Sequence, residues 1–148
     1  MTKTNKVGSI AARVIMGGLF LFSGLNGLFQ FAPMPPMPPA AGAFAGALLA
    51  SGYFFPLLKI LEIAIGVLLL SGRFVPLALT MAAPIVVNII AFHAALAPAG
   101  LGAPIVLLVT ELYLAWTYRA VFAPLLRAKV ATVTTDREPT RHELATAS

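Results

Sequence analysis

The sequence predicts an all-α integral membrane protein, folded as a four-transmembrane-helix bundle with a short outer interfacial helix. Its composition is the first reason: 59% of the 148 residues are hydrophobic, only 10% are charged, and the mean hydropathy is +0.93. Soluble domains contain about 45–50% apolar and about 25% charged residues. The second reason is that the apolar residues form four runs, each near the ~20 residues that cross a ~30 Å hydrocarbon core as a helix. The third reason is that proline and glycine residues separate the runs.

The four predicted spans are, in order, residues 10–31, 54–72, 76–97 and 103–122. Three of them carry proline in the first turn, where the missing N–H leaves no hydrogen bond unmade: Pro56, Pro76 and Pro104. Gly72 and Gly100 lie at or near breaks, and Pro124 ends the fourth span. The first span is longer than the 7–15 apolar residues of a signal peptide. We therefore expect it to be retained.

The connection between the first two spans is unusual. Residues 33–39 contain five prolines and predict an extended, polyproline-like segment. Residues 40–50 then predict a short helix that is apolar on all sides and ends before Gly52. We expect this helix to lie at the outer interface and to cover the mouth of the bundle.

The basic residues predict the orientation. They flank the inner ends of the spans and are absent from the connections at residues 32–52 and 98–102: Lys3, Lys6, Arg13, Arg73, Arg119, Arg127 and Lys129. Since cytoplasmic loops carry the excess of lysine and arginine, both termini should be cytoplasmic. Residues 1–9 form the expected cytoplasmic N-terminus, 10–126 the membrane domain, and 127–148 a polar, disordered tail.

Several function classes are disfavoured. The net charge of +5 does not indicate nucleic-acid binding, because the basic residues mark helix ends and form no stripe with aromatic residues. The chain has no cysteine, which excludes thiol redox chemistry and thiolate metal sites. We expect no metal site and no intrinsic cofactor, so any redox role needs a bound molecule such as a quinone, or a partner.

Polar residues inside the spans are the candidate ligand-binding residues, because charged groups at this depth cost roughly 3 kcal/mol each and need partners. They are Asn26, Lys59, Glu62, Asn88, His93 and Glu111. A rise of about 1.5 Å per residue places them, together with Ser23, roughly 6–14 Å below the outer ends of their helices. The sequence therefore predicts a polar pocket in the outer half of the membrane, beneath the short helix.

A purely structural interpretation explains part of this pattern. Lys59 and Glu62 are three residues apart on one helix face and can neutralise each other, whereas Asn88 can join helices by hydrogen bonds. Glu111 has no cation within one turn of its helix, so it is either protonated or paired with Lys59 from another helix. Gly17, Gly24 and Gly27 predict a small-residue packing face on the first helix.

The ordered motifs resemble the DoxX family of small bacterial membrane proteins over residues 10–126. The resemblance is carried by Arg13 with Gly18-Leu19-Phe20 and Ser23-Gly24-Leu25, Leu61-Glu62-Ile63, Ser71-Gly72-Arg73-Phe74, Ala83-Pro84 with Asn88, Phe92-His93, and Glu111-Leu112-Tyr113 with Trp116. It implies a compact four-helix domain of the bacterial inner membrane that works beside a quinone. Many relatives carry a lysine near the end of the first helix. Here that stretch begins at Asn26, and Lys59 could supply the charge.

Three hypotheses about function follow. The first is a membrane subunit of a redox system, catalytic or non-catalytic, that binds a quinone-like or lipid amphiphile and depends on a redox partner protein. In it His93 or Lys59 would donate to a ring oxygen, and Glu62 or Glu111 would exchange protons. The second is a small transporter or lipid-handling protein, although no inverted repeat is present. The third is a structural subunit of a larger membrane complex, and the sequence is compatible with an oligomer.

Overall fold

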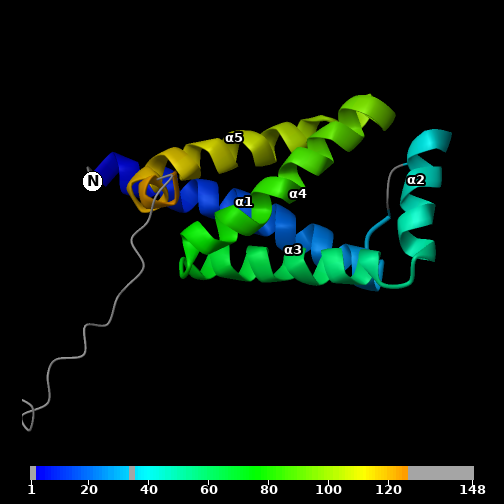
Figure 1. The fold of residues 1–148 in the computed structure, drawn as a ribbon, viewed down its shortest axis with the longest axis horizontal. Helices are drawn as coiled ribbons and strands as arrows, with labels where there is room; N and C mark the ends of the chain where they lie inside the picture. The colour runs from blue at the N-terminus through cyan, green and yellow to red at the C-terminus, as the bar shows by residue number, and fades with distance from the viewer. Residues whose placement is uncertain (1–2, 34–35, 127–148) are drawn as a thin grey trace, which may run out of the picture.

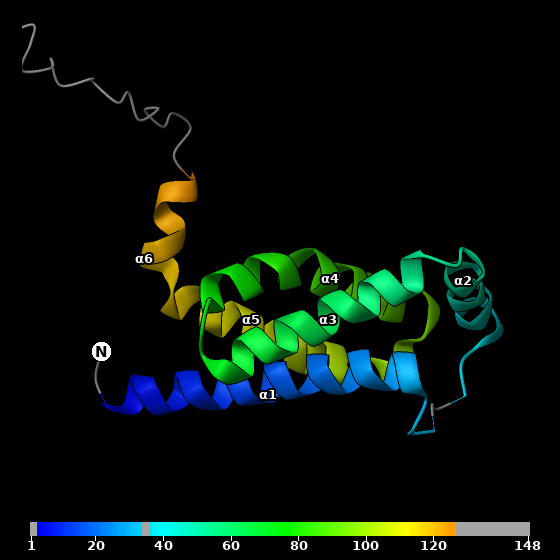
Figure 2. The same cartoon turned by 90° about the horizontal axis from the view of Figure 1, so that it is seen from below.

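The computed structural model describes residues 3–33 and 36–126, and within these ranges every regular element is helical (Figures 1 and 2). The elements are α1 (Lys3–Phe29), α2 (Pro39–Ala50), α3 (Phe54–Ser71), α4 (Val75–Leu96), the 3-10 turn η1 (Pro98–Gly100), α5 (Gly102–Thr117), α6 (Arg119–Phe122) and the 3-10 turn η2 (Ala123–Leu126). The predicted all-α class is therefore confirmed for this part of the chain. The tail at 127–148 lies outside the described residues.

Four long helices form the body of the molecule. The α1–α3 interface is the most extensive, α5 packs on α1 and α4, and α3 packs on α4. α2 lies across the far end of the bundle (Figure 1), where the sequence predicts a helix at residues 40–50. The core is filled by large side chains that are less than 2% exposed: Met16, Phe20, Ile65, Leu69, Val86 and Leu114.

Three helices are long and apolar enough to cross a membrane, namely residues Lys6–Phe29 of α1, α3 and α4. Their outward faces carry large apolar side chains such as Phe22, Ile60 and Val67, each more than half exposed. Lipid solvates such faces, whereas water does not. Three such helices are typical of a membrane protein, and the second and third predicted spans match α3 and α4 to within one residue.

The fourth predicted span, residues 103–122, is not one helix. α5 ends at Thr117 after 16 residues, and α6 leaves in a different direction (Figure 2). The Thr117 hydroxyl donates to the Tyr113 carbonyl, and the Arg119 guanidinium donates to the Trp116 carbonyl at 3.0 Å. Arg119 thus satisfies a terminal carbonyl and places a cation at the negative end of the helix dipole, which favours ending the helix there.

Glycine allows α1 and α3 to pack with their backbones in contact. A Cβ atom built on Gly66 would lie 2.9 Å from the Gly17 carbonyl oxygen, and one built on Gly24 would lie 2.8 Å from the Lys59 carbonyl oxygen. Both separations are shorter than a side chain tolerates. The predicted small-residue face of the first helix is confirmed, and Gly66 is its partner on α3.

Apart from Lys59, the basic residues of the described ranges lie at one end of the bundle. The N-terminal part of α1, the turn between α3 and α4, and α6 all lie at the end opposite to α2 (Figure 1). There the Arg13 guanidinium lies against Gly72, which ends α3 in the left-handed conformation at φ 69°. An arginine beside a helix C-terminus interacts favourably with its partial negative charge. The expected N-terminal segment 1–9 belongs to α1 from Lys3 onward.

Candidate functional site

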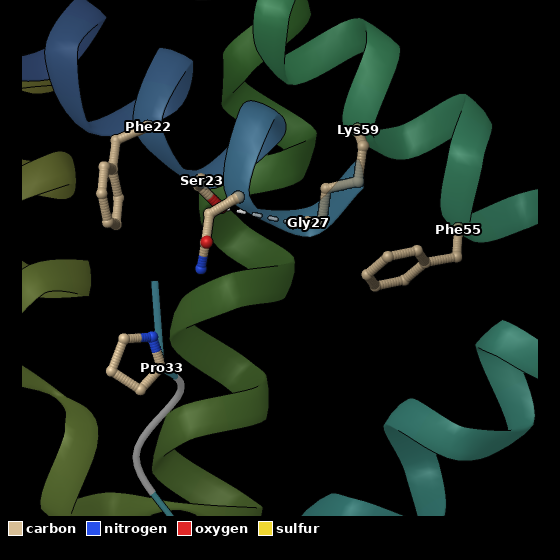
Figure 3. Close-up of a pocket in the computed structure, with 7 residues that line it drawn as sticks. Phe22, Ser23, Gly27, Pro33, Phe55 and Lys59 are labelled. Atoms are coloured by element: carbon tan, nitrogen blue, oxygen red, sulfur yellow. Dashed lines mark hydrogen bonds between the residues drawn. The ribbon is translucent and has the colours of Figure 1, made fainter. Parts of the chain in front are cut away.

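A cavity of about 250 Å³ lies between the end of α1, the segment that follows it, and the start of α3 (Figure 3). It belongs to the end of the bundle that α2 crosses, opposite to the basic end (Figure 1). The cavity combines three aromatic or proline rings with a few polar groups, and its lining residues are Phe22, Ser23, Asn26, Gly27, Pro33, Phe55 and Lys59. Apolar walls with a few polar groups are typical of sites for small molecules.

Lys59 is the charged group of the cavity. Its Nζ donates to both carboxylate oxygens of Glu62, at 3.0 and 2.9 Å, and to the Ser23 hydroxyl oxygen at 3.2 Å. The two charged side chains are only 12% and 3% exposed, so the ion pair is largely shielded. The predicted pairing of Lys59 with Glu62 is confirmed. Ser23 accepts from Lys59, which leaves the hydroxyl hydrogen able to donate to a molecule in the cavity.

Gly27 determines the course of the lysine side chain. A Cβ atom on Gly27 would lie 2.5–2.6 Å from Cδ and Cε of Lys59, so the aliphatic part of the lysine needs this glycine. Nζ also lies 5.3 Å from the centre of the Phe55 ring, within the range of a cation–π contact. The methylenes thus run over α1 while the ammonium reaches the polar part of the cavity.

Asn26 has a structural role at this site. Its Oδ1 accepts from the Ala32 backbone N–H at 2.7 Å, and its Nδ2 donates to the Ala32 carbonyl at 3.2 Å. These two bonds fold the chain back after α1, where Gln30 adopts a positive φ of 50°. Asn26 therefore shapes the cavity wall, and its amide is already engaged by the backbone.

Glu62 does not line the cavity and meets it only through Lys59, and the other three candidate residues do not line it either. Asn88 is exposed on α4. His93 is half-buried; its Nδ1 lies 2.9 Å from the Ile89 carbonyl oxygen, and its ring packs against Gly100. Glu111 is buried on α5, and its Oε1 has no hydrogen-bond partner among the described residues.

The pocket therefore differs from the predicted one in its composition. The sequence predicts polar groups from four helices around one centre, whereas this cavity is formed by α1, the segment after it and α3. The ion pair between Lys59 and Glu111 that the sequence allowed does not form, because Lys59 is bound to Glu62. Sequence reasoning missed the ring-bearing walls Phe22, Pro33 and Phe55, since apolar residues in an apolar span carry no signal.

In the described ranges no three histidine, aspartate or glutamate side chains come close enough to share a metal ion. Comparisons with protein-family models, with curated proteins and with solved structures find no match for this chain. A function is therefore assigned from the geometry of the cavity and from the sequence motifs of the membrane domain.

Proposed function

We propose that this chain is a membrane subunit of a quinone-linked redox system, and that the cavity between α1 and α3 binds the ring of a quinone. In this proposal α5 is the fourth membrane-spanning helix and both termini are cytoplasmic. The protein is then a DoxX-like component of a bacterial inner membrane. Support for the orientation comes from the basic residues other than Lys59, which lie at one end of the bundle, because positive residues at helix ends remain on the cytoplasmic side.

One observation carries the proposal: an ammonium and a hydroxyl meet at a cavity that also has ring-bearing walls, formed by Phe22, Pro33 and Phe55. Phe22 and Phe55 offer faces or edges to a planar ring, and the Phe22 ring is itself fixed by an edge contact with Phe31 at 5.7 Å. The Ser23 hydroxyl can donate to a ring oxygen (Figure 3). A quinone has this combination of flat apolar ring and acceptor oxygens, and its tail would extend into lipid.

Glu62 and Lys59 are the groups that could move a proton at this site. Glu62 is bound through both oxygens to Nζ of Lys59, which also contacts Ser23. A proton could therefore pass among three groups that are already hydrogen-bonded to one another. A bound quinone would supply the electron chemistry, and a partner protein with a redox centre would exchange the electrons.

The test is to purify the protein in mild detergent and to quantify the quinone and lipid that accompany it. Ser23→Leu removes the hydroxyl and fills the cavity, while Ser23 is exposed enough for the larger side chain to leave the core intact. We expect about one quinone per native chain, and at least about a fivefold loss in Ser23→Leu, because losing a hydrogen bond worth 1–3 kcal/mol alone lowers the affinity by about 5- to 160-fold.

His93→Ala is the matched control, since His93 lies outside the cavity on α4. It should retain the quinone at the native level. If native protein carries only bulk phospholipid, and if neither substitution changes that lipid, the proposal is wrong. A specific phospholipid that is lost in Ser23→Leu would instead assign the cavity to a lipid head group and would favour lipid handling.

A further inference from the structure

Glu111 is a buried carboxyl group that the proposed quinone site does not use. It is 7% exposed and lies on the inward face of α5, between Leu107 and Leu114, which belong to the core that α5 shares with α1 and α4. It lies six residues, or about 9 Å along the axis, before Thr117 at the end of α5. Glu111 is therefore in the half of the bundle near the basic end, whereas the cavity is at the opposite end (Figure 1).

One oxygen of this carboxyl group has no donor among the described residues. Its Oε1 is shielded from solvent and accepts no hydrogen bond. The adjacent Thr110 does not donate to it, because the Thr110 hydroxyl donates to two carbonyls of its own helix, at 2.7 and 3.0 Å. The sequence allowed Glu111 to be protonated or to pair with Lys59, and Lys59 is bound to Glu62. Pairing is thus ruled out as the source of neutrality.

The ionisable side chains on the helices around Glu111 are engaged elsewhere. On α1, Lys6 is exposed, and the Arg13 guanidinium lies against the end of α3. On α4 the titratable group is His93, whose Nδ1 lies 2.9 Å from a backbone carbonyl oxygen near the opposite end of the bundle. On α5 itself, the Tyr113 hydroxyl lies against α1. The described parts of these helices therefore offer Glu111 no counter-ion.

We propose that Glu111 is a proton-binding site inside the bundle: its carboxyl group carries a proton and is neutral, whereas Glu62 is ionised by its pairing with Lys59. A charge in an apolar interior costs far more than a neutral acid, and a bound proton removes the charge without a partner side chain. The two buried carboxyl groups differ because Glu62 has an ammonium within 3.0 Å of both oxygens.

A proton on Glu111 gives the bundle a second group that can take part in proton transfer. Carboxyl groups at membrane depth that gain and lose a proton are typical of proton relays in membrane proteins. Glu111 is separated from the cavity along the bundle, so this inference does not depend on a bound quinone.

Infrared spectroscopy tests the protonation directly, because a neutral carboxylic acid has a C=O stretching band that an ionised carboxylate lacks. The full chain is purified at neutral pH in an alkyl maltoside detergent, which has no C=O group. The native spectrum minus that of Glu111→Gln should show this band. Glu62→Gln is the matched control, and its difference spectrum should lack the band, since Glu62 is ionised by Lys59. Glu111→Asp keeps a carboxyl group and should retain the band.

Heavy water tests whether the proton is bound reversibly, and it needs only the native chain. Transfer to heavy water should shift the band to lower frequency as deuterium replaces the proton. Gel filtration establishes that each variant remains folded. A native chain without a band that shifts would overturn the proposal, because Glu111 would then be ionised or closed to exchange. A band that disappears in Glu62→Gln and persists in Glu111→Gln would also overturn it.

Discussion

Replacement of Gly66 by leucine is expected to abolish assembly of the helix bundle. A Cβ atom at residue 66 would lie 2.8 Å from the backbone nitrogen of Leu21 and 2.9 Å from the Gly17 carbonyl oxygen. Both neighbours are backbone atoms, so no side-chain rotation relieves the clash and α1 must move away from α3. Overpacking a core costs about 1–3 kcal/mol even when side chains can adjust. We expect a loss above that range, measured by unfolding in mixed detergent micelles.

Gly18→Leu provides the control for this experiment. Gly18 is the neighbour of Gly17 on α1. No atom lies within 4 Å of a Cβ built on Gly18, whereas Gly17 packs against α3. Leucine there should leave the stability unchanged or raise it by up to about 1 kcal/mol, because glycine is a poor helix former. Equal losses at residues 18 and 66 would show that general glycine effects, not the α1–α3 contact, set the stability.

The same backbone contact illustrates what could be predicted from the sequence. Glycine spacing on the first helix indicated a packing face, and proline and glycine indicated the ends of α3 and α4 to within one residue. These features are local, since they depend on missing side chains or missing N–H groups in a known backbone geometry. The pairing of Lys59 with Glu62 is local for the same reason: residues three apart share one helix face.

The direction of side chains around each helix could not be predicted. Asn88 and Glu111 have comparable predicted depths, yet the first faces outward from α4 and the second is buried on α5. A helix that is apolar on all sides has almost no amphipathic pattern, so its sequence does not indicate which face meets its neighbours. The depth of a side chain along its helix follows from counting residues, whereas the rotation of the helix about its own axis is set by how it packs on its neighbours. The break after Thr117 could not be predicted, because no proline or glycine marks it; the contact found there is the Arg119 guanidinium donating to the Trp116 carbonyl.

Replacement of Glu62 by leucine should destabilise the protein by about 3–5 kcal/mol, because it leaves the ammonium of Lys59 shielded and unpaired. Ser23 remains the nearest hydrogen-bond partner of Nζ at 3.2 Å, and a neutral hydroxyl does not balance the charge. The free energy of unfolding in mixed micelles measures the loss. Glu62→Gln keeps the shape and an acceptor oxygen, and should lose less stability than Glu62→Leu.

The double variant Lys59→Met with Glu62→Leu separates structure from function. Removing both charges also removes the cost of taking them out of water, so we expect most of the lost stability to return. A double variant no more stable than Glu62→Leu would show that the pair contributes far more than mutual neutralisation. If the folded double variant loses the bound quinone, the ion pair is retained for the cavity rather than for the bundle, since the bundle no longer requires it. Retention of the quinone would leave the ring walls and Ser23 as the groups that hold it.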